Sequence, residues 1–465
     1  MTIPMRSGIT AVLVCLLWTL ACETMPASAA NTPSNIILIV VESLRADHVG
    51  CYGCRRATSP AIDAIASQGV RFDQAIAGAS WTTPAVMSMF TSLPPSLHQT
   101  VSSSTALPEG MTTLAAELKK GGYQTAAIIV NPCASSKYGF NRGFDMFDDN
   151  SIQLAAGLGD LDLNNNLVSD KLTQYAVKWL KSGRQRNRPF FLYLFYFDPH
   201  YDYMPPSPYD GMFTDPDYYG GQDGSKITTL EGKVISKADK EQIIGLYDGE
   251  VRFTDDQIKV LLDTLRSMNL LNDSLLVITG DHGEEFWEHD GVAHGHTLYD
   301  ELLRVPLIIH WPKEIKPKQV ISKQVSLIDL MPTILDMAGM PIPSQCRGQS
   351  LVPLFRPSAN RTFSERPVFS ETESKISLKS IRSPSQKLIE HIKDNTFEAY
   401  DLDNDPFEWD DLALTPQYAG FQPLLAAYQE WKKQNAEFNA KHAPAQTIKI
   451  DPQLMKQLKS LGYAH

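Results

Sequence analysis

The chain has 465 residues, of which 43% are hydrophobic and 20% charged, and its formal net charge is -11 at pH 7. This length exceeds what one hydrophobic core usually supports, so we expect one large domain and one smaller domain. The acidic balance argues against nucleic acid as a partner and weakly against an anionic membrane surface. An anionic substrate stays compatible with it, because a metal ion and a few histidines can set the field inside a pocket.

The first thirty residues have the pattern of a signal peptide. Arg6 is the only early charge, residues 9–21 are apolar but too few to span a bilayer comfortably, and residues 27–30 are small. We therefore expect an exported protein, periplasmic or secreted, whose mature chain has no integral membrane segment. Lipid attachment at Cys22 is an alternative, although Thr19 stands where a lipoprotein signal usually has Leu.

Apolar runs alternate with helical patterns along the chain. The predicted strands cover residues 35–41, 124–130, 190–197, 274–279 and 306–310. The predicted helices cover residues 61–68, a stretch that begins at Pro84, 113–120, 165–181 and 241–268, the last with a start near Ser236. This alternation predicts an α/β fold with a mostly parallel central sheet and helices on both faces.

Two further regions have a different character. Residues 201–229 are rich in Pro, Gly, Tyr and Asp without periodicity, which predicts a loop over the pocket. After residue 355 the pattern predicts a smaller C-terminal α+β region, an antiparallel sheet closed by a helix at 422–439. The expected organisation is thus a signal peptide (1–30), a catalytic domain (31–355) and a C-terminal subdomain (356–465).

Acidic and imidazole side chains follow two of the predicted strands. The strand at 35–41 leads to Glu42, and the strand at 274–279 stops at Gly280 before Asp281 and His282. Ligands of open α/β sheets bind at the carboxyl ends of strands, and this donor set suits a divalent cation. By itself, an Asp-His pair after a strand is as well explained by a turn.

Thr82 and Thr83 precede Pro84 at the start of a predicted helix. Pro is common in the first helical turn, and the free N–H groups there favour an anion. A threonine at this place is also a common helix N-cap, so both interpretations stay open at this point.

The mature chain has four further cysteines besides Cys22. Cys51 and Cys54 have the spacing of a redox or metal pair, but no second such pair accompanies them. A local disulfide or free thiols are therefore favoured over zinc. Cys133 and Cys346 have no evident partner in the sequence.

Several motifs in order resemble the sulfatase family of the alkaline phosphatase superfamily. They cover nearly the whole mature chain and comprise residues 35–52, Ser80-Trp-Thr-Thr-Pro84, Phe197-Asp-Pro-His200, Gly280-Asp-His-Gly-Glu-Glu285, His294-Gly-His-Thr-Leu-Tyr-Asp-Glu301, Tyr400-Asp-Leu-Asp-Asn-Asp-Pro406 and the tail at 458–463. The resemblance implies an alkaline phosphatase-like fold, a bound metal and a covalent intermediate.

The chain also departs from the sulfatase pattern. Sulfatases carry Cys or Ser in Cys-x-Pro-Ser-Arg and convert that residue to formylglycine, whereas this chain has Thr82, which cannot be oxidised to the aldehyde, and lacks the following Ser and Arg. Glu42 replaces the first metal-binding aspartate, and residues 129–132 replace a Lys-Trp-His segment. Thr with Glu is instead similar to phosphoglycerol and phosphoethanolamine transferases and to phosphodiesterases of the superfamily.

The resemblance implies roles for particular residues. Glu42, Asp281, His282 and the hydroxyl of Thr82 would hold one divalent cation, which could be Mn, Mg, Ca or Zn, and Thr82 would be the nucleophile. His200 and His294 would hold non-bridging oxygens or protonate the departing alcohol. Less defined candidates are His48, His98, His289 and His296, with Asp47 and Asp198 as weak candidates for a second metal.

These features predict a metal-dependent hydrolase or transferase that cleaves a phosphate or sulfate ester through a covalent intermediate on Thr82. Phosphoryl chemistry is favoured, because a threonine ester has no aldehyde exit and must be cleaved by water or passed to an acceptor. The substrate would be a small molecule or a lipid- or glycan-linked ester. The alternatives are a sulfuric ester hydrolase without formylglycine and a non-catalytic binding protein on the same fold.

Overall fold

The computed structural model describes residues 1–2, 32–149, 168–357, 361–450 and 452–460. The predicted signal peptide, the lipidation site at Cys22, residues 165–167 of a predicted helix and residues 461–463 of the tail motif lie outside this range. In the part described, no helix is both long enough and apolar enough to cross a membrane.

The core of the fold is a sheet of eight strands within the described residues, in the order β11-β2-β10-β7-β1-β6-β4-β5. Neighbouring strands among β7, β1, β6, β4 and β5 pair in parallel, β10 runs antiparallel to both its neighbours, and β11 pairs in parallel with β2. The strands are β1 (Asn35–Val41), β2 (Val70–Ile76), β4 (Gln124–Ile129), β5 (Met146–Asp148), β6 (Phe190–Tyr196), β7 (Ser274–Gly280), β10 (Arg304–His310) and β11 (Gln319–Ser326). The predicted mostly parallel sheet is confirmed.

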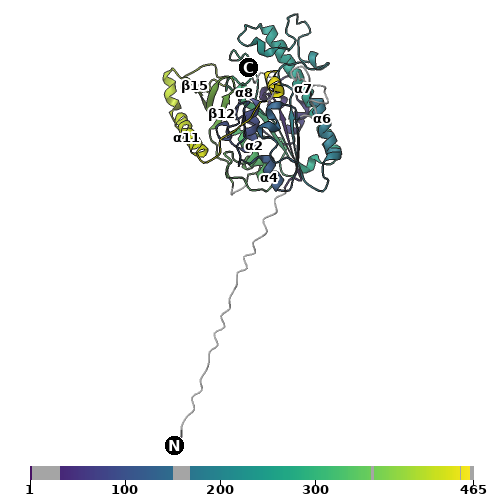
Figure 1. Ribbon diagram of the computed structural model, residues 1–465, viewed down its shortest axis with the longest axis vertical. Helices are drawn as coiled ribbons and strands as arrows, with labels where there is room; N and C mark the ends of the chain where they lie inside the picture. The colour runs from purple at the N-terminus through teal and green to yellow at the C-terminus, as the bar shows by residue number, and fades with distance from the viewer. Residues whose placement is uncertain (3–31, 150–167, 358–360, 451, 461–465) are drawn as a thin grey trace. The chain divides into compact units, whose positions relative to one another are not determined.

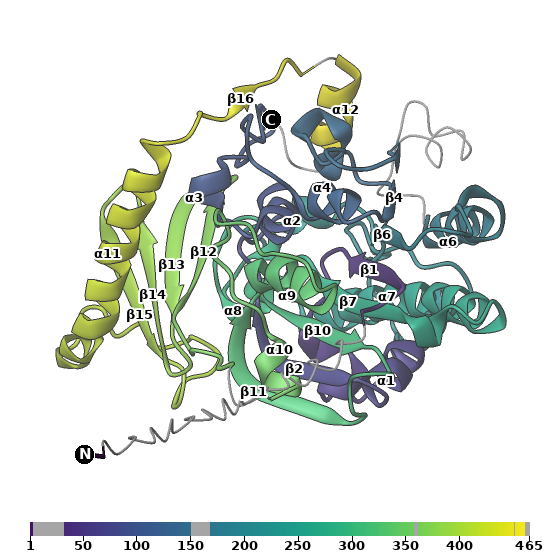
Figure 2. The same ribbon diagram turned by 90° about the horizontal axis from the view of Figure 1, so that it is seen from below.

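Both faces of this sheet are buried, which explains why its central strands are continuous apolar runs. Alternate residues of β1 belong to different cores: Ile36, Leu38 and Val40 to one, and Ile37 and Ile39 to the other. Figure 2 shows the helices on the two sides of the sheet. On one side lie α2 (Thr82–Thr91), α4 (Leu114–Lys120) and α9 (Leu330–Met337), and on the other α1 (Pro60–Ala66), α6 (Ser169–Lys178) and α7 (Lys237–Ser267).

The helices lie close to their predicted positions. The side chain of Ser236 caps the first turn of α7, and that of Thr113 caps the first turn of α4, so that both polar residues stand just outside their helices. Along α7, Val260 is 49% exposed and does not belong to the buried face to which its apolar character assigned it.

The prediction missed the strand at residues 70–76, which form β2. This strand carries Arg71, Asp73 and Gln74, which are only partly buried, between the apolar Val70, Phe72 and Ala75. The neighbouring β11 was not predicted either, and its first half is mostly exposed at the end of the sheet. Strands at this position have too little buried surface to form an apolar run.

The C-terminal region contains the predicted elements, an antiparallel sheet and a helix. A second, antiparallel sheet contains β12 (Val368–Glu373), β13 (Ser377–Arg382), β14 (Gln386–His391) and β15 (Thr396–Asp401). Figure 1 shows the helix α11 (Gln422–Asn439) beside this sheet. Its bounds are those predicted from the sequence. The backbone N–H of Glu371 donates to the Gly78 carbonyl at 3.0 Å, which joins β12 to the segment between β2 and α2. A domain boundary near residue 355 stays a prediction.

Residues 201–229 form an irregular segment with short 3-10 turns at Tyr209–Gly211 and Ile227–Leu230. Its first part is anchored, because Tyr203 is buried against Tyr247 of α7 and Phe286. This anchoring holds the segment beside the chain that follows β7.

Candidate active site

Four neighbouring strands of the central sheet, β7, β1, β6 and β4, end at the same edge. Asp281 and His282 follow β7, Glu42 follows β1, His200 follows β6 and Asn131 follows β4. Each of these five side chains is buried, with at most 2% of the residue exposed. The parallel pairing of strands far apart in the sequence therefore brings the predicted residues together.

Thr82 is the first residue of α2, and its hydroxyl points toward these strand ends. Oγ1 donates to Glu42 Oε1 at 2.8 Å and lies 3.4 Å from His282 Nε2. The N-cap position belongs to Trp81, whose side chain makes no capping hydrogen bond. The interpretation of Thr82 as a simple N-cap is therefore wrong, and its hydroxyl belongs to the cluster of Glu42 and His282.

Glu42, Asp281 and His282 form a group whose ligand atoms all lie within 4.8 Å of one another. One oxygen of each carboxylate is satisfied: Glu42 Oε1 also accepts from Asn131 Nδ2, and Asp281 Oδ1 accepts from the backbone N–H of Ser43 at 3.1 Å. Ser43 adopts φ +52°, in the left-handed region, at this turn.

The other two oxygens, Glu42 Oε2 and Asp281 Oδ2, are buried without a hydrogen-bond partner. Burial raises the pKa of both carboxyls, and for Glu42 the charge of Asp281 raises it further. Two unpartnered carboxylate oxygens beside an imidazole are costly unless a cation compensates them. The donor set thus fits a divalent metal ion on the chemistry of its own residues.

Two imidazole rings of this cluster are held by a backbone carbonyl at Nδ1. The Nδ1 atom of His282 donates to the Gly283 carbonyl at 2.8 Å, and that of His200 donates to the Tyr201 carbonyl at 2.7 Å. A carbonyl can only accept, so the proton of each neutral ring lies on Nδ1 and Nε2 carries the lone pair. His282 therefore has the tautomer that a metal ligand requires.

His294 belongs to the same cluster through its neighbours. Its ring centroid lies 4.4 Å from that of His282 and 5.1 Å from that of His200, and its Nδ1 lies 2.8 Å from Glu284 Oε1. Burial lowers the pKa of His294 well below its ordinary value and that of His200 to about 3. Both rings are thus neutral at pH 7 in the structure described.

The remaining candidates lie elsewhere or have other partners. His48 contacts Asp248 at 2.6 Å, and His98 lies 3.1 Å from the Ser88 hydroxyl. Asp47 pairs with Arg45 at 2.8 Å, and Asp198 accepts the backbone N–H groups at the start of α6. The structure does not bring Asp47 or Asp198 into the cluster of Glu42 and Asp281.

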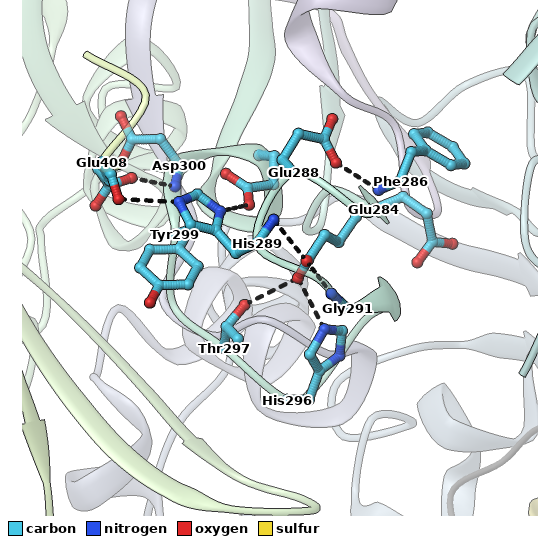
Figure 3. A network of polar contacts seen from close by, with 12 residues as sticks. Glu284, Phe286, Glu288, His289, Gly291, His296, Thr297, Tyr299, Asp300 and Glu408 are labelled. Carbon is cyan, nitrogen blue, oxygen red and sulfur yellow. Dashed lines mark hydrogen bonds and ion pairs between the residues drawn. The ribbon is translucent and has the colours of Figure 1, made fainter. Parts of the chain in front are cut away.

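A second group, Glu285, His289 and Glu301, also has the spacing of metal ligands. Its polar atoms are already paired, however: the Glu285 oxygens accept from the backbone of His289 and Gly291 and contact His296 Nε2 at 2.8 Å (Figure 3). His289 lies 2.6 Å from Glu301 and 3.0 Å from the Glu408 carbonyl. Both oxygens of Glu285 and both ring nitrogens of His289 thus have partners, in contrast to the unpartnered oxygens of Glu42 and Asp281.

His289 differs from the buried histidines in its charge. Burial alone would lower its pKa, but the hydrogen bond and charge of Glu301 raise it to about 9. A protonated imidazole donates from both nitrogens and cannot bind a metal ion. His289 therefore acts as a cation within the network.

Sequence reasoning missed two residues of the site. Asn131 was noted only as a replacement in a lost Lys-Trp-His segment, and Glu284 had no role. Asn131 is the first polar residue after a buried strand, which is the signal that identified Glu42, and it could have been found in the same way. Glu284 lies two residues beyond His282, but its contact with His294 is a tertiary one.

The four described cysteines, Cys51, Cys54, Cys133 and Cys346, are free thiols. Of the two interpretations left open by the sequence, the structure has the unpaired one. Burial raises the pKa of Cys51 to about 12 and also raises that of Cys54, so neither is a reactive thiolate at neutral pH.

Comparison with known families gives two matches. The family model described as sulfatase matches residues 34–340, and the model described as the C-terminal part of N-sulphoglucosamine sulphohydrolase matches residues 288–437. The first match alone covers more than half of the chain and contains all the residues of the cluster.

Similar characterised proteins include two from Bacteroides thetaiotaomicron. A delta 4,5-hexuronate-2-O-sulfatase is 26% identical over 433 residues, which cover 84% of this chain and 87% of the relative. An N-acetylglucosamine-6-O-sulfatase is 24% identical over 518 residues, which cover 93% of this chain and 92% of the relative.

Solved structures share the fold. One, in complex with its substrate D-glucosamine-2-N,6-O-disulfate, has a TM-score of 0.75 and 23% identity and covers 88% of this chain and 99% of that chain. The phosphonate monoester hydrolase of Agrobacterium radiobacter has a TM-score of 0.71 and 20% identity, with coverage of 90% and 98%. The same fold thus accommodates sulfate and phosphonate esters in other proteins.

Proposed function

Since the chain belongs to the sulfatase family, we propose that it is a metal-dependent ester hydrolase that uses unmodified Thr82 as its nucleophile. The observation that carries this proposal is the position of the Thr82 hydroxyl, 2.8 Å from Glu42 and 3.4 Å from His282 Nε2. A nucleophile needs both a partner for its proton and a fixed direction of attack, and this contact provides both.

Glu42, Asp281 and His282 are the residues that would hold the divalent cation. When bound, the cation supplies positive charge that lowers the pKa of the Thr82 hydroxyl and stabilises charge on the ester oxygens. The candidate metals are Mn, Mg, Ca and Zn, because a site of two carboxylates and one imidazole suits each of them.

The reaction would proceed in two steps on this chain's own residues. Thr82 Oγ1 forms a bond to the phosphorus or sulfur atom while the bond to the alcohol oxygen breaks, and the alcohol leaves with a proton. Water then attacks the same phosphorus or sulfur atom, the bond to Thr82 Oγ1 breaks, and the phosphate or sulfate is released while the hydroxyl is regenerated. His200 and His294, which lie beside His282, would bind the non-bridging oxygens or supply that proton in their protonated form, which the negative charge of the bound ester would favour.

We infer that the substrate is a phosphate ester of an alcohol. A formylglycine hydrate can expel its ester by collapsing to the aldehyde, whereas a threonine ester depends on attack by water, for which phosphoryl transfer is well suited. The fold shared with a phosphonate monoester hydrolase supports this choice. A sulfate ester is the second candidate, and the sulfatases among the relatives favour it.

A paired screen tests the ester class. Matched 4-nitrophenyl sulfate, phosphate monoester and phosphate diester substrates are compared in the presence of each of the four metals. We expect a phosphate ester to be turned over fastest, and activity to be independent of any formylglycine-generating enzyme in the expression host. Turnover of the sulfate alone would transfer the proposal to the second candidate.

The nucleophile is tested by substitution of Thr82. Thr82→Ala should lose turnover by at least about a thousandfold and should form no covalent adduct, because the hydroxyl that would carry the intermediate is removed. Thr82→Ser should keep part of the rate. The measurements are steady-state turnover and intact mass after a rapid quench with the active ester.

Thr91→Ala is the matched control for this experiment. Thr91 is a buried threonine in the last turn of α2, and its hydroxyl donates to the Met87 carbonyl at 2.7 Å. The control should keep both turnover and the adduct. A Thr82→Ala enzyme with normal turnover would show that water attacks directly and would refute the role of Thr82.

Export of the mature chain stays part of the proposal. The sequence of residues 1–30 supports it, and the N-terminal sequence of the protein recovered from the periplasm or medium of an expressing bacterium would test it.

A further inference from the structure

The turn between β12 and β13 reaches the candidate active site from the C-terminal sheet. Thr372 Oγ1 donates to the Gly295 carbonyl at 3.3 Å, next to His294. A Cβ placed on Gly295 would lie 3.4 Å from Ser374 Oγ and 3.5 Å from Trp81 Cβ. The turn thus packs against the residue that follows His294 and against the N-cap of α2.

Lys375 is at the tip of this turn. Its Nζ lies 3.0 Å from Glu231 Oε2, at the end of the irregular segment that includes residues 201–229, and its side chain is 24% exposed. Burial has the largest effect on the pKa of His294 and of Glu284, and the nearby charge of Lys375 lowers the pKa of both. Three separate parts of the chain therefore meet here: the turn, the segment that ends at Glu231 and the loop that carries His294.

The electrostatics of this place suit an anionic group of a ligand. The inner cluster of Glu42, Asp281 and Glu284 is fully buried and acidic, whereas Lys375 supplies an ammonium group at its partly exposed rim. The Glu231 partner is 47% exposed. An ion pair this accessible contributes little stability, so an incoming anion can replace Glu231 at small cost.

We propose that Lys375 forms a subsite for a second anionic group, a carboxylate or a sulfate, on the substrate whose ester is cleaved at Thr82. This assignment rests on the proposed function and adds a substrate class to it: the ester of an acidic or doubly substituted sugar rather than of a neutral alcohol. Lys375 is a specificity-determining residue in this scheme, because its ammonium binds a part of the substrate that does not react.

Equilibrium binding tests the subsite independently of catalysis. Dissociation constants are measured by isothermal titration calorimetry on Thr82→Ala protein loaded with metal. One ligand pair is methyl glucuronide and methyl glucoside, each with a sulfate or phosphate ester at O2, O3 or O4. The second pair is glucosamine 6-sulfate with and without an N-sulfate, so that the two pairs distinguish a carboxylate from a sulfate.

We expect at least one acidic ligand to bind about fivefold to tenfold more tightly than its neutral counterpart, with a preference that declines as salt is added. Adding Lys375→Met should reduce the preference to about twofold or less, and Lys375→Arg should restore most of it. Glu231→Gln should increase the preference, because it removes the competing carboxylate.

Lys393→Met is the matched control. Lys393 is exposed in the neighbouring turn between β14 and β15. Its substitution removes the same charge from the same sheet and should leave the preference for acidic ligands unchanged. An equal preference in the Lys375→Met and parent proteins, or equal binding of every acidic and neutral pair, would overturn the subsite. Failure of the nucleophile proposal would instead appear as turnover of these ligands by Thr82→Ala, so the two failures are distinguishable.

Discussion

At the scale of single residues, the partner decides what a side chain can do. His282, His289 and His294 lie within thirteen residues of one another, yet His282 has a backbone carbonyl on Nδ1, His289 has the Glu301 carboxylate, and His294 has Glu284. The first ring has the tautomer that a metal ligand requires, and the second is held as a cation. Residue type alone therefore does not distinguish a metal ligand from a member of an ion-pair network.

Glu42→Asp tests the metal ligands. Retraction of the carboxylate by one methylene would break its contact with Thr82 Oγ1 and move its unpartnered oxygen away from Asp281. We expect metal affinity to fall by at least about tenfold, with loss of turnover and an unchanged fold. The measurements are calorimetric titration with each metal, turnover and circular dichroism. Unchanged metal affinity would remove Glu42 from the ligand set.

The raised pKa of His289 leads us to expect that the stability of the protein depends on pH. Its pKa is raised from 6.5 to about 9 in the folded protein, so its contribution is complete below pH 6.5 and is lost as the pH rises through 9. We expect the difference in melting temperature between the parent and His289→Gln to be largest near pH 6 and to decrease by pH 9.5. A difference that is constant over this range would contradict the charged state of His289.

At the scale of elements, α7 stabilises the start of another helix. Asp255 of α7 is fully buried, and its two oxygens accept the backbone N–H groups of Ala61 and Ile62 at 2.8 Å each. Ser59, the N-cap of α1, makes no side-chain capping bond. An acid 194 residues away in the sequence thus satisfies the amides that a local cap would normally satisfy.

Asp255→Ala should destabilise the protein by about 2 to 4 kcal/mol, because two buried amides lose their acceptor. Asp255→Asn keeps one acceptor oxygen and should cost about half as much. Asp263→Ala on the exposed face of α7 is the control and should change stability by less than about 0.5 kcal/mol. Urea denaturation measures all three, and equal stability of Asp255→Ala and the parent would contradict the capping role.

At the scale of the whole molecule, a buried ion-pair network joins the antiparallel sheet to the short helix α8 (Asp300–Leu303). Lys387 of β14 is completely buried and lies 3.0 Å from Asp300 and 2.7 Å from Glu408. Arg382 of β13 also pairs with Asp300 at 2.8 Å. The backbone N–H of Asp300 donates to Glu408 Oε2 at 2.7 Å, and Figure 3 shows these two residues.

Lys387→Met should destabilise the protein by about 3 to 5 kcal/mol, because it leaves the buried Glu408 carboxylate without its cation, while Asp300 keeps only Arg382. The double variant Lys387→Met with Glu408→Gln should recover part of this loss by removing one of the uncompensated charges. Chemical denaturation of both variants and of Glu408→Gln alone provides the cycle. Strictly additive effects would show that Lys387 and Glu408 do not act as a pair.

The sequence by itself determined the core of the fold and the proximity of Glu42, Asp281 and His282. The five long apolar runs had to be buried strands, and the carboxyl ends of parallel strands meet at one edge, so Glu42, Asp281 and His282 could be placed together without a structure. The helix at 422–439 could be predicted for a similar reason, since its pattern is local.

Only the tertiary structure decided the features that depend on contacts between distant segments. The pattern of β2 is ambiguous because one face is half exposed, and the state of His289 depends on the side chain of Glu301. Lys375 comes to the site because the turn of a second sheet packs against Gly295, which lies 80 residues earlier in the chain. The periodicity of a sequence indicates whether a residue is buried, but it does not indicate which other segment packs against it. The proposed substrate specificity of this protein therefore could not be inferred without its tertiary structure.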